Sequence, residues 1–243
     1  MKRLIINADD FGLTSSVNYG ILHAYLHHSI SSISLMVNVF ETSEAVEIMK
    51  KYQIDCVGIH VNLTLGRPVS PVQDIPSLVD EQGCFHKSDW LFQNRVNEDE
   101  LILEFDNQIA YFQQLTGQKP KHINYHHRYD FYKNYPRLAK HLFEKYQLPM
   151  RLERDEKGYL YEYAVNQTFF LNSQDNIQDY LVGDLIELPC HVGFVDQRLL
   201  QISSLNMQRT KDSEIVNSKD FKELYQSLGY QLVGFEDVKK RVE

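Results

Sequence analysis

Four apolar runs of this 243-residue sequence end in side chains that are able to bind a metal ion or to move a proton. Asp9 and Asp10 end the first run, and His60, His126 and His191 each end a later one. If the runs are parallel strands, their carboxyl ends share the face where α/β folds bind ligands. A single Asp or His is more often structural, but four strands ending this way predict one active site.

The adjacent carboxylates of Asp9 and Asp10 indicate a cation. Neighbouring carboxylates repel each other, and burial disfavours their charged forms, so an ionised pair near a core needs a metal ion or strong hydrogen-bond donors. Neighbouring residues on a strand point to opposite sides. We therefore expect one aspartate to bind metal and the other to handle protons, unless the strand has already ended. The alternative is a capping turn before a helix that starts near Thr14.

His60 and His126 are the imidazole partners that such a site would use. A neutral histidine binds a divalent metal through one ring nitrogen while an acceptor fixes the other. With one carboxylate they give three protein ligands, and the open fourth position is typical of catalytic metal sites. His127 competes with His126, and the spacing does not choose between them. His191 is a candidate acid for a leaving group.

The elements that position these residues are βα units around a parallel sheet, because short β-rich runs alternate with helical periodicity. The predicted strands are 3–8, 32–39, 56–61, 122–126, 149–153, 185–190 and 231–235. Apolar stripes predict helices within 17–25, 101–112, 138–146 and 221–228. Three stretches fit the alternation poorly and are expected to be loops around the site, namely 65–97, 155–179 and 192–217.

Length and composition favour a single globular domain over residues 1–243. The chain has 43% hydrophobic residues, a net charge of −8 and no block of basic residues, which argues against a nucleic-acid partner. The apolar run at 4–6 is too short for a signal peptide, and no stretch nears the ~20 apolar residues of a membrane span. We therefore expect a cytoplasmic protein without a membrane partner. Three cysteines without CxxC spacing do not support a disulfide framework.

Several longer motifs contain or flank the candidate residues. They are NADDFGLT followed by VNYGIL, SSISLMVN at 31–38, GIHVNLTLGRP at 58–68, IPSLVDEQGCF at 75–85, GQKPKHINYHHRYD at 117–130 and ELPCHVGFVD at 187–196. Through these motifs the chain resembles, almost from end to end, the YdjC-like family of carbohydrate deacetylases, which includes the chitooligosaccharide deacetylases.

The resemblance implies a distorted TIM-like (β/α) barrel of seven parallel strands with helices outside, often as a homodimer. It implies hydrolysis of the acetamide of an N-acetylated amino sugar or short chitooligosaccharide, with release of acetate. Asp10, His60 and His126 would hold one divalent metal, since the motif alignment selects His126 over His127. Water would attack the carbonyl with Asp9 as the base, and His191 would protonate the departing amine. The implied substrate-binding residues are Asn38, Asn62, Tyr125, Arg151 and Arg154.

The fourth-strand motif departs from the family pattern, which is written Thr-His-Leu-Asp-Ser-His. Asn124 and Tyr125 replace the Asp and the Ser, and Arg128 stands where relatives carry further histidines. A charge is thereby lost beside the site, and an aromatic face that can stack on a sugar is gained. The family is commonly described with magnesium, but histidine ligands suit zinc, nickel, cobalt or manganese better.

Two other functions compete with the deacetylase. A phosphoester hydrolase would keep the metal, but the sequence shows no further cluster of carboxylates for a second ion. A non-catalytic sugar-binding protein would have lost turnover through the altered fourth-strand motif. Acetate release that vanishes when Asp9 or His60 becomes Ala distinguishes the deacetylase from both.

Overall fold

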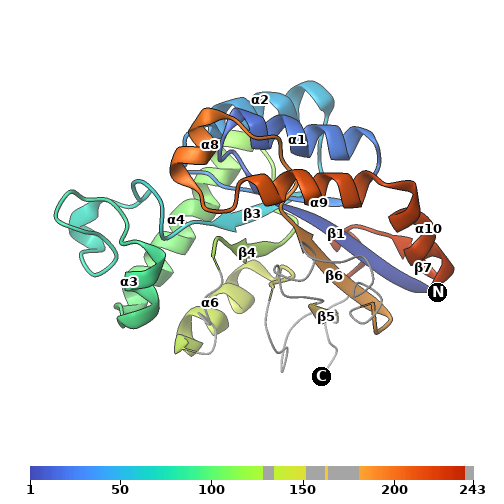
Figure 1. The fold of residues 1–243 in the computed structure, drawn as a ribbon. Coiled ribbons are helices and arrows are strands. Elements are labelled where there is room, and N and C mark those ends of the chain that lie inside the picture. Colours follow the sequence, from blue (N-terminus) through green and yellow to red (C-terminus); the bar gives the residue numbers. More distant parts are fainter. Residues whose placement is uncertain (128–133, 152–161, 164–180, 239–243) are drawn as a thin grey trace.

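The computed structural model describes residues 1–127, 134–151, 162–163 and 181–238, and its centre is a parallel β-sheet (Figure 1). In the described residues the sheet has seven strands in the order β4-β3-β2-β1-β6-β5, with β7 paired to β1. The strands are β1 Lys2–Phe11, β2 Ser32–Leu35, β3 Val57–Val61, β4 Ile123–Tyr125, β5 Glu162–Tyr163, β6 Leu185–Cys190 and β7 Tyr230–Leu232.

Strand β1 lies in the middle of the sheet. One of its edges pairs with β6 from Arg3 to Ala8. The opposite edge pairs first with β7 and then, from Asn7 onward, with β2. Strands β2, β3 and β6 are buried along their whole length, as expected for parallel strands with both faces covered. Because the strands are parallel, their carboxyl ends lie together at one end of the sheet.

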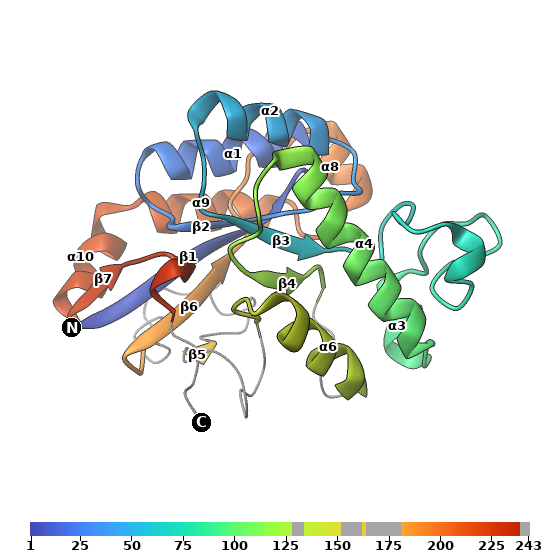
Figure 2. The same ribbon diagram turned by 180° about the vertical axis from the view of Figure 1, so that it is seen from behind.

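Helices pack around the outside of the sheet, and they contact one another in the order α9, α1, α2, α4 and α6 (Figures 1 and 2). Thr14 caps α1 by accepting a hydrogen bond from the Val17 amide, and Gly117, with a φ of 70°, ends α4. The described part of the chain contains no helix that is both long and apolar enough to cross a membrane. The longer helices are α1 Ser15–Leu26, α2 Thr42–Tyr52, α4 Glu98–Thr116, α6 Pro136–Tyr146, α9 Met207–Asn217 and α10 Lys219–Ser227. The shorter ones are α3 Ser88–Gln93, α8 Gln197–Ile202, η1 Val72–Asp74 and η3 Phe235–Asp237.

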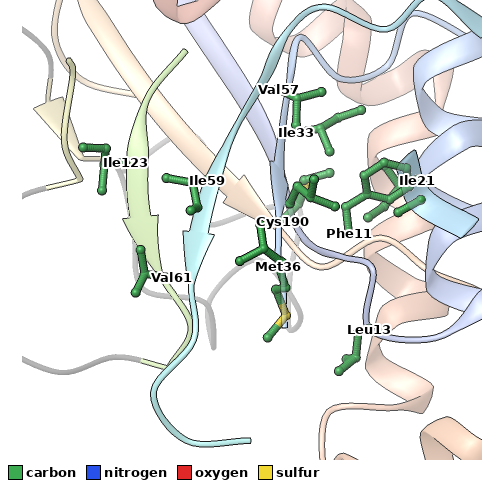
Figure 3. Close-up of a cluster of buried hydrophobic side chains, with 14 of the residues drawn as sticks. Phe11, Leu13, Ile21, Ile33, Met36, Val57, Ile59, Val61, Ile123 and Cys190 are labelled. Carbon is green, nitrogen blue, oxygen red and sulfur yellow. The ribbon is translucent and has the colours of Figure 1, made fainter. Parts of the chain in front are cut away.

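The apolar core lies between the sheet and these helices. Figure 3 shows part of it, with Ile33, Ile59 and Ile123 on neighbouring strands and Phe11 beside Ile21 of α1. All five side chains are fully buried. Burying an aliphatic or aromatic side chain of this size stabilises a fold by about 1.5–3 kcal/mol. This packing fixes the strand ends on which the candidate site is built.

The parallel α/β architecture predicted from the sequence is confirmed, but the predicted fifth strand differs. Of residues 149–153, Met150 forms an isolated parallel bridge with Ile123, and the last two residues lie outside the described ranges. Strand β5 lies instead at Glu162–Tyr163, beside β6. The described strands form an open half-barrel in which β4 and β5 do not pair. A closed, seven-stranded barrel therefore stays a prediction.

The stretch 192–217, which we expected to be a loop, contains α8 and α9. The buried residues of α9 are Arg209, Asp212 and Val216, so the face that meets the core is mostly charged. Sequence analysis detects helices by a repeating apolar stripe, and this helix has none. The stretch 65–97 contains η1 and α3, and the stretch 155–179 lies outside the described ranges except for β5.

Candidate metal centre

The carboxyl end of β1 turns both aspartates toward the same histidine. Strand alternation predicts that Asp9 and Asp10 point to opposite sides, but the β1–β2 register shifts between Ala8 and Phe11. Asp10 has a φ of 71°, in the left-handed region that non-glycine residues seldom adopt. As a result, Asp9 Oδ1 lies 4.0 Å from His60 Nδ1, and Asp10 Oδ1 lies 3.2 Å from His60 Nε2. Both aspartates are buried.

Asp10, His60 and His126 bring three ligand atoms together. His126 Nδ1 lies 2.9 Å from Asp10 Oδ1, on which His60 Nε2 also converges. The ligand atoms of the three residues all lie within 4.8 Å of one another. Two imidazole nitrogens and one carboxylate oxygen suit a divalent transition metal, and three protein ligands leave a coordination position open. The residues present therefore fit the metal ion that the sequence predicts.

The structure places His126, and not His127, against Asp10. Nδ1 of His127 lies 2.7 Å from the hydroxyl of Thr64 instead. The φ of His127 is 64°, so the chain turns directly after His126, and the two rings pack 3.9 Å apart. Burial, helped by the nearby charge of His126, lowers the pKa of His127 to about 3. His127 is therefore a neutral neighbour of the cluster.

An arginine from the far end of the chain holds the second oxygen of Asp10. Nη2 of Arg209 donates to Asp10 Oδ2 at 2.5 Å, across a sequence separation of 199 residues. Burial raises the pKa of Asp10, but the charges of Arg209 and His126 outweigh it and hold the pKa well below its ordinary value. Asp10 is therefore ionised, and its Oδ1 faces the histidines.

Asp9 is held by a separate arginine. Arg151 donates from Nη1 to Asp9 Oδ2 at 2.7 Å and from Nη2 to Oδ1 at 3.0 Å, and Asn7 donates to Oδ1 at 2.7 Å. Arg151 also donates to Glu187 Oε1 from Nε and Nη2. Burial raises the pKa of Asp9, but the charge and hydrogen bonds of Arg151 outweigh it and lower the pKa to about 2. Arg151 thus orients Asp9, and the contact with substrate that the resemblance implies for Arg151 stays a prediction.

His191 lies at the end of β6, close enough to Asp9 and Asp10 for their charges to act on its pKa. Burial dominates and lowers that pKa to about 4, so the ring is neutral at pH 7. The backbone amide of His191 donates to Oδ2 of Asp212 on α9 at 2.8 Å. Burial raises the pKa of Asp212 to about 7. Helix α9 therefore supplies polar partners to two candidate site residues.

Two residues predicted to bind substrate have structural hydrogen bonds. Asn62 accepts from the amides of Thr64 and Leu65 and donates to Asn38 Oδ1 at 3.1 Å. Asn38 also donates to the Arg67 carbonyl at 3.0 Å. Both amides thus shape the loop after β3, and their contact with substrate stays a prediction.

Asn38 lines, in addition, a surface cavity together with Arg67 and Tyr111. Two further residues, Tyr125 and Arg154, are predicted to bind substrate. Tyr125 is half-buried at the end of β4. Arg154 lies outside the described residues.

Sequence reasoning missed three charged residues of the site region, which are Glu187, Arg209 and Asp212. Glu187 carried a signal, because it interrupts the apolar strand Leu185–Cys190, and a fully buried carboxylate there requires a charged partner. No sequence signal marked Arg209 and Asp212, because their helix has no apolar stripe from which it could be predicted. Their contacts with Asp10 and His191 depend on the fold.

Known proteins are similar to this chain over most of its length, as the sequence motifs predict. A model of the YdjC-like protein family matches residues 3–227. A carbohydrate deacetylase of Clostridium beijerinckii is 31% identical over 248 residues, which cover 97% of this chain and 100% of that protein. A chitooligosaccharide deacetylase of Yersinia enterocolitica is 33% identical over 264 residues, with 97% and 99% covered.

The fold of this chain also matches that of a solved structure. A protein of Enterococcus faecalis V583, named for cellobiose-phosphate cleavage, superposes with a TM-score of 0.83 at 30% identity and covers 97% of this chain and 98% of its own. Sequence and structure thus match along nearly the full length. The chain belongs to the YdjC-like protein family.

Proposed function

We propose that this chain is a metal-dependent hydrolase that removes the N-acetyl group from an acetylated amino sugar or a short chitooligosaccharide and releases acetate. The observation that carries the proposal is the convergence of Asp10, His60 and His126, whose ligand atoms lie within 4.8 Å of one another. Relatives named carbohydrate and chitooligosaccharide deacetylases support the choice of reaction.

The residues around the cluster suit amide hydrolysis. A divalent ion in this site would act as a Lewis acid on the acetamide carbonyl and would make a water molecule more acidic. Asp9, held on both oxygens by Arg151, is the group we assign to accept the proton of the attacking water. Its pKa of about 2 makes Asp9 a weak base, but one that is ionised at any physiological pH.

His191 is the group we assign to protonate the departing amine. Its pKa of about 4 means that the resting ring is neutral. It can therefore serve as an acid only after it takes up a proton during turnover. Among the hydrogen bonds of the described residues, none involves the His191 ring, so its nitrogens are available for that exchange.

The test is an acetate-release screen. Purified protein is stripped with a chelator and reloaded with zinc, nickel, cobalt, manganese or magnesium. It is then incubated with N-acetylglucosamine, its 6-phosphate and short chitooligosaccharides. We expect acetate with at least one metal and substrate, and none from the stripped protein. His60→Gln and Asp9→Asn should each lose more than about 100-fold in rate, since changing outer-shell partners alone typically costs about 10–100-fold.

His141→Gln is the matched control, because this histidine pairs with Asp106 between α4 and α6, outside the cluster. It should keep the rate of the parent protein. Phosphate release without acetate would instead favour a phosphoester hydrolase, and metal-independent binding of chitooligosaccharide without turnover would favour a sugar-binding protein. A protein that binds no metal and releases no acetate in any condition would contradict the proposal.

Zinc, nickel, cobalt or manganese are the ions that two histidine ligands favour over the magnesium of the family description. We also propose, from family resemblance, a homodimer that acts on a small carbohydrate. From length and composition we propose a single domain over residues 1–243 that acts in the cytoplasm. The screen tests the metal and the substrate, and light scattering of the purified protein tests the homodimer.

A further inference from the structure

A side chain of α4 makes the contacts at the end of β3 that a neighbouring strand would make. The register of β3 with β4 ends at Val61, and Asn62 is the next residue. Oε1 of Gln108 accepts from the Asn62 amide at 3.0 Å, and Nε2 of Gln108 donates to the Asn62 carbonyl at 2.7 Å. One glutamine therefore holds both backbone groups of a fully buried residue.

Glu104, one helical turn before Gln108, fixes the orientation of that amide. Its Oε1 accepts from Gln108 Nε2 at 2.7 Å. The nitrogen of Gln108 thus faces two acceptors and its oxygen faces one donor, so the amide fits in a single orientation. Glu104 also accepts from the backbone amides of Val69 and Ser70, at 3.0 and 2.9 Å. Helix α4 therefore holds the connection after β3 at two points.

Glu104 and Gln108 are fully buried on the face of α4 that also carries Leu101, Phe105 and Ile109. A buried carboxylate or amide costs free energy unless its hydrogen bonds are satisfied. An apolar pair would fill the same face without that cost. The contribution that distinguishes Glu104 and Gln108 is therefore the position of the backbone that they hold.

The backbone beside Asn62 carries both histidines of the candidate metal cluster. His60 lies two residues before Asn62, on β3. The backbone amide of His126 donates to the carbonyl of Val61 at 2.8 Å. Asn62 thus follows directly on the residue that joins the two histidines, and a shift at Asn62 changes where His60 lies relative to His126.

A second set of contacts joins the same segment to the cluster. Asn62 Oδ1 accepts from the backbone amide of Thr64 at 3.1 Å. Oγ1 of Thr64 lies 2.7 Å from Nδ1 of His127, and the His127 ring packs 3.9 Å from the ring of His126. The position of Asn62 therefore reaches His126 through the side chains as well as through the backbone.

We propose that Gln108, oriented by Glu104, is a positioning residue of the metal centre, and that it sets the spacing of His60 and His126 by holding the backbone of Asn62. The inference rests on the metal site of the proposed function and goes beyond it, because the hydrogen bonds of Gln108 go to Asn62 and Glu104 and not to a ligand residue. Buried backbone groups that lose their partners must find others, which moves the end of β3. A metal site tolerates ligand displacements of only about 0.2 Å.

Zinc calorimetry on Gln108→Met tests the proposal, because methionine keeps the length of the side chain but removes its donor and its acceptor. We expect the dissociation constant for Zn²⁺ to rise about 10–100-fold, the range typical of outer-shell partners. Cobalt-loaded protein gives a second measurement, since the visible absorption of Co²⁺ depends on the geometry of its ligands. The Co²⁺ spectrum of the variant should differ from that of the parent protein.

The exchange variant Glu104→Gln/Gln108→Glu keeps the charge and the side-chain volumes of the parent, and it carries the test if Gln108→Met does not fold. A carboxylate at position 108 can accept from the Asn62 amide but cannot donate to the Asn62 carbonyl. This variant should also bind Zn²⁺ more weakly, by about tenfold.

Thr116→Val is the matched control. It removes a buried hydroxyl from the same helix, but the hydrogen bonds of Thr116 go to Phe112 and Gln118 at the far end of α4. All variants are compared at a temperature where circular dichroism shows them folded, and their stabilities are measured separately. Thr116→Val should keep the zinc affinity and the Co²⁺ spectrum of the parent, whatever stability it loses.

The results that would overturn the inference differ from those that would overturn the proposed function. If the parent binds Zn²⁺ and a folded Gln108 variant binds it equally well with the same Co²⁺ spectrum, the positioning role is wrong while the metal site stands. An equal loss of affinity in Thr116→Val, or failure of both Gln108 variants to fold, would show that the pair serves the stability of the fold instead. If the parent binds no Zn²⁺, the metal site itself fails.

Discussion

At the scale of single residues, the buried charges of the site occur in opposed pairs. Asp10 is matched by Arg209, and Asp9 shares Arg151 with Glu187. Such pairing is required because an isolated charge inside a protein loses far more hydration than it regains. Asp212 differs from these residues, because it forms no ion pair among the described residues and its Oδ2 accepts instead from the backbone amide of His191.

Asp212 predicts a pH dependence of stability. Burial raises its pKa from 3.8 to about 7, so the folded protein binds this proton more tightly than the unfolded chain. Its contribution is fully present below about pH 4 and is lost as the pH rises through about 7. Asp212→Asn cannot titrate. The unfolding free energy of the variant minus that of the parent should therefore increase from about pH 4 to 7, by up to about 1.4 kcal/mol per pH unit.

Urea denaturation of the two proteins across this pH range measures the difference. His191 contributes with the opposite sign, because its pKa is lowered to about 4 and its unfolded form takes up the proton first as the pH falls. That contribution is common to both proteins and cancels in the comparison. A difference that stays constant with pH would show that Asp212 is not protonated in the folded state near neutrality.

The candidate ligands could be predicted from the sequence, because each follows an apolar run and the carboxyl ends of parallel strands lie together. The direction in which the Asp10 side chain points could not be predicted. Strand alternation predicted opposite sides for Asp9 and Asp10, and a register shift with a left-handed φ at Asp10 overrides it. Sequence patterns report which residues alternate but not where a strand is irregular.

At the scale of elements, helix α9 connects the candidate site with the helices outside the sheet. On its buried face, Arg209 donates to Asp10 and Asp212 accepts from the backbone amide of His191. The helix also packs against α1 and α10. A helix that buries charge depends on its partners for stability, since those charges are costly without them.

Arg209→Met should lower the free energy of unfolding by about 3–5 kcal/mol, because it leaves the carboxylate of Asp10 buried without its cation. Saturating Zn²⁺ should recover part of the loss, since the metal supplies positive charge to the same carboxylate. Chemical denaturation with and without zinc measures both effects.

Arg198→Met is the comparison variant for this test. Arg198 of α8 pairs with Glu41, the residue before α2, and both side chains are partly exposed. A surface pair contributes about 0–1 kcal/mol, so this variant should lose little stability and show no added effect of zinc. Equal losses in the two variants would contradict a special role for Arg209.

The elements differ in how well their sequences predict them. Strands β1, β3 and β6 each contain a short group of apolar residues and were predicted close to their observed positions. Helix α2 was not predicted, although Ala45, Ile48 and Met49 lie on a buried face at helical spacing. Helix α9 could not be predicted from an apolar stripe, because charged side chains take the place of apolar ones on its inner face.

At the scale of the whole molecule, the cluster joins three separate segments of the chain through Asp10 on β1, His60 on β3 and His126 after β4. The unfolded chain does not hold these groups together. Binding of a metal to the native state alone therefore stabilises the entire fold.

Saturating zinc should raise the melting temperature of the parent protein and should increase its unfolding free energy by about 2.7 kcal/mol at 100 times the dissociation constant. Differential scanning calorimetry across a zinc titration measures the effect. His60→Gln should show no shift, whereas His141→Gln should behave as the parent does. An equal shift in all three proteins would indicate nonspecific binding elsewhere.

The central position of β1 has a consequence for how the protein is made. This strand is synthesised before every strand it pairs with, and two of those partners, β6 and β7, follow all the other described strands in the sequence. A nascent chain that ends before β6 has one long unpaired strand edge and lacks both His191 and Arg209. Contacts between such distant segments form slowly. We therefore expect the sheet to form fully, and the metal to be acquired, only after β6 and β7 have been synthesised.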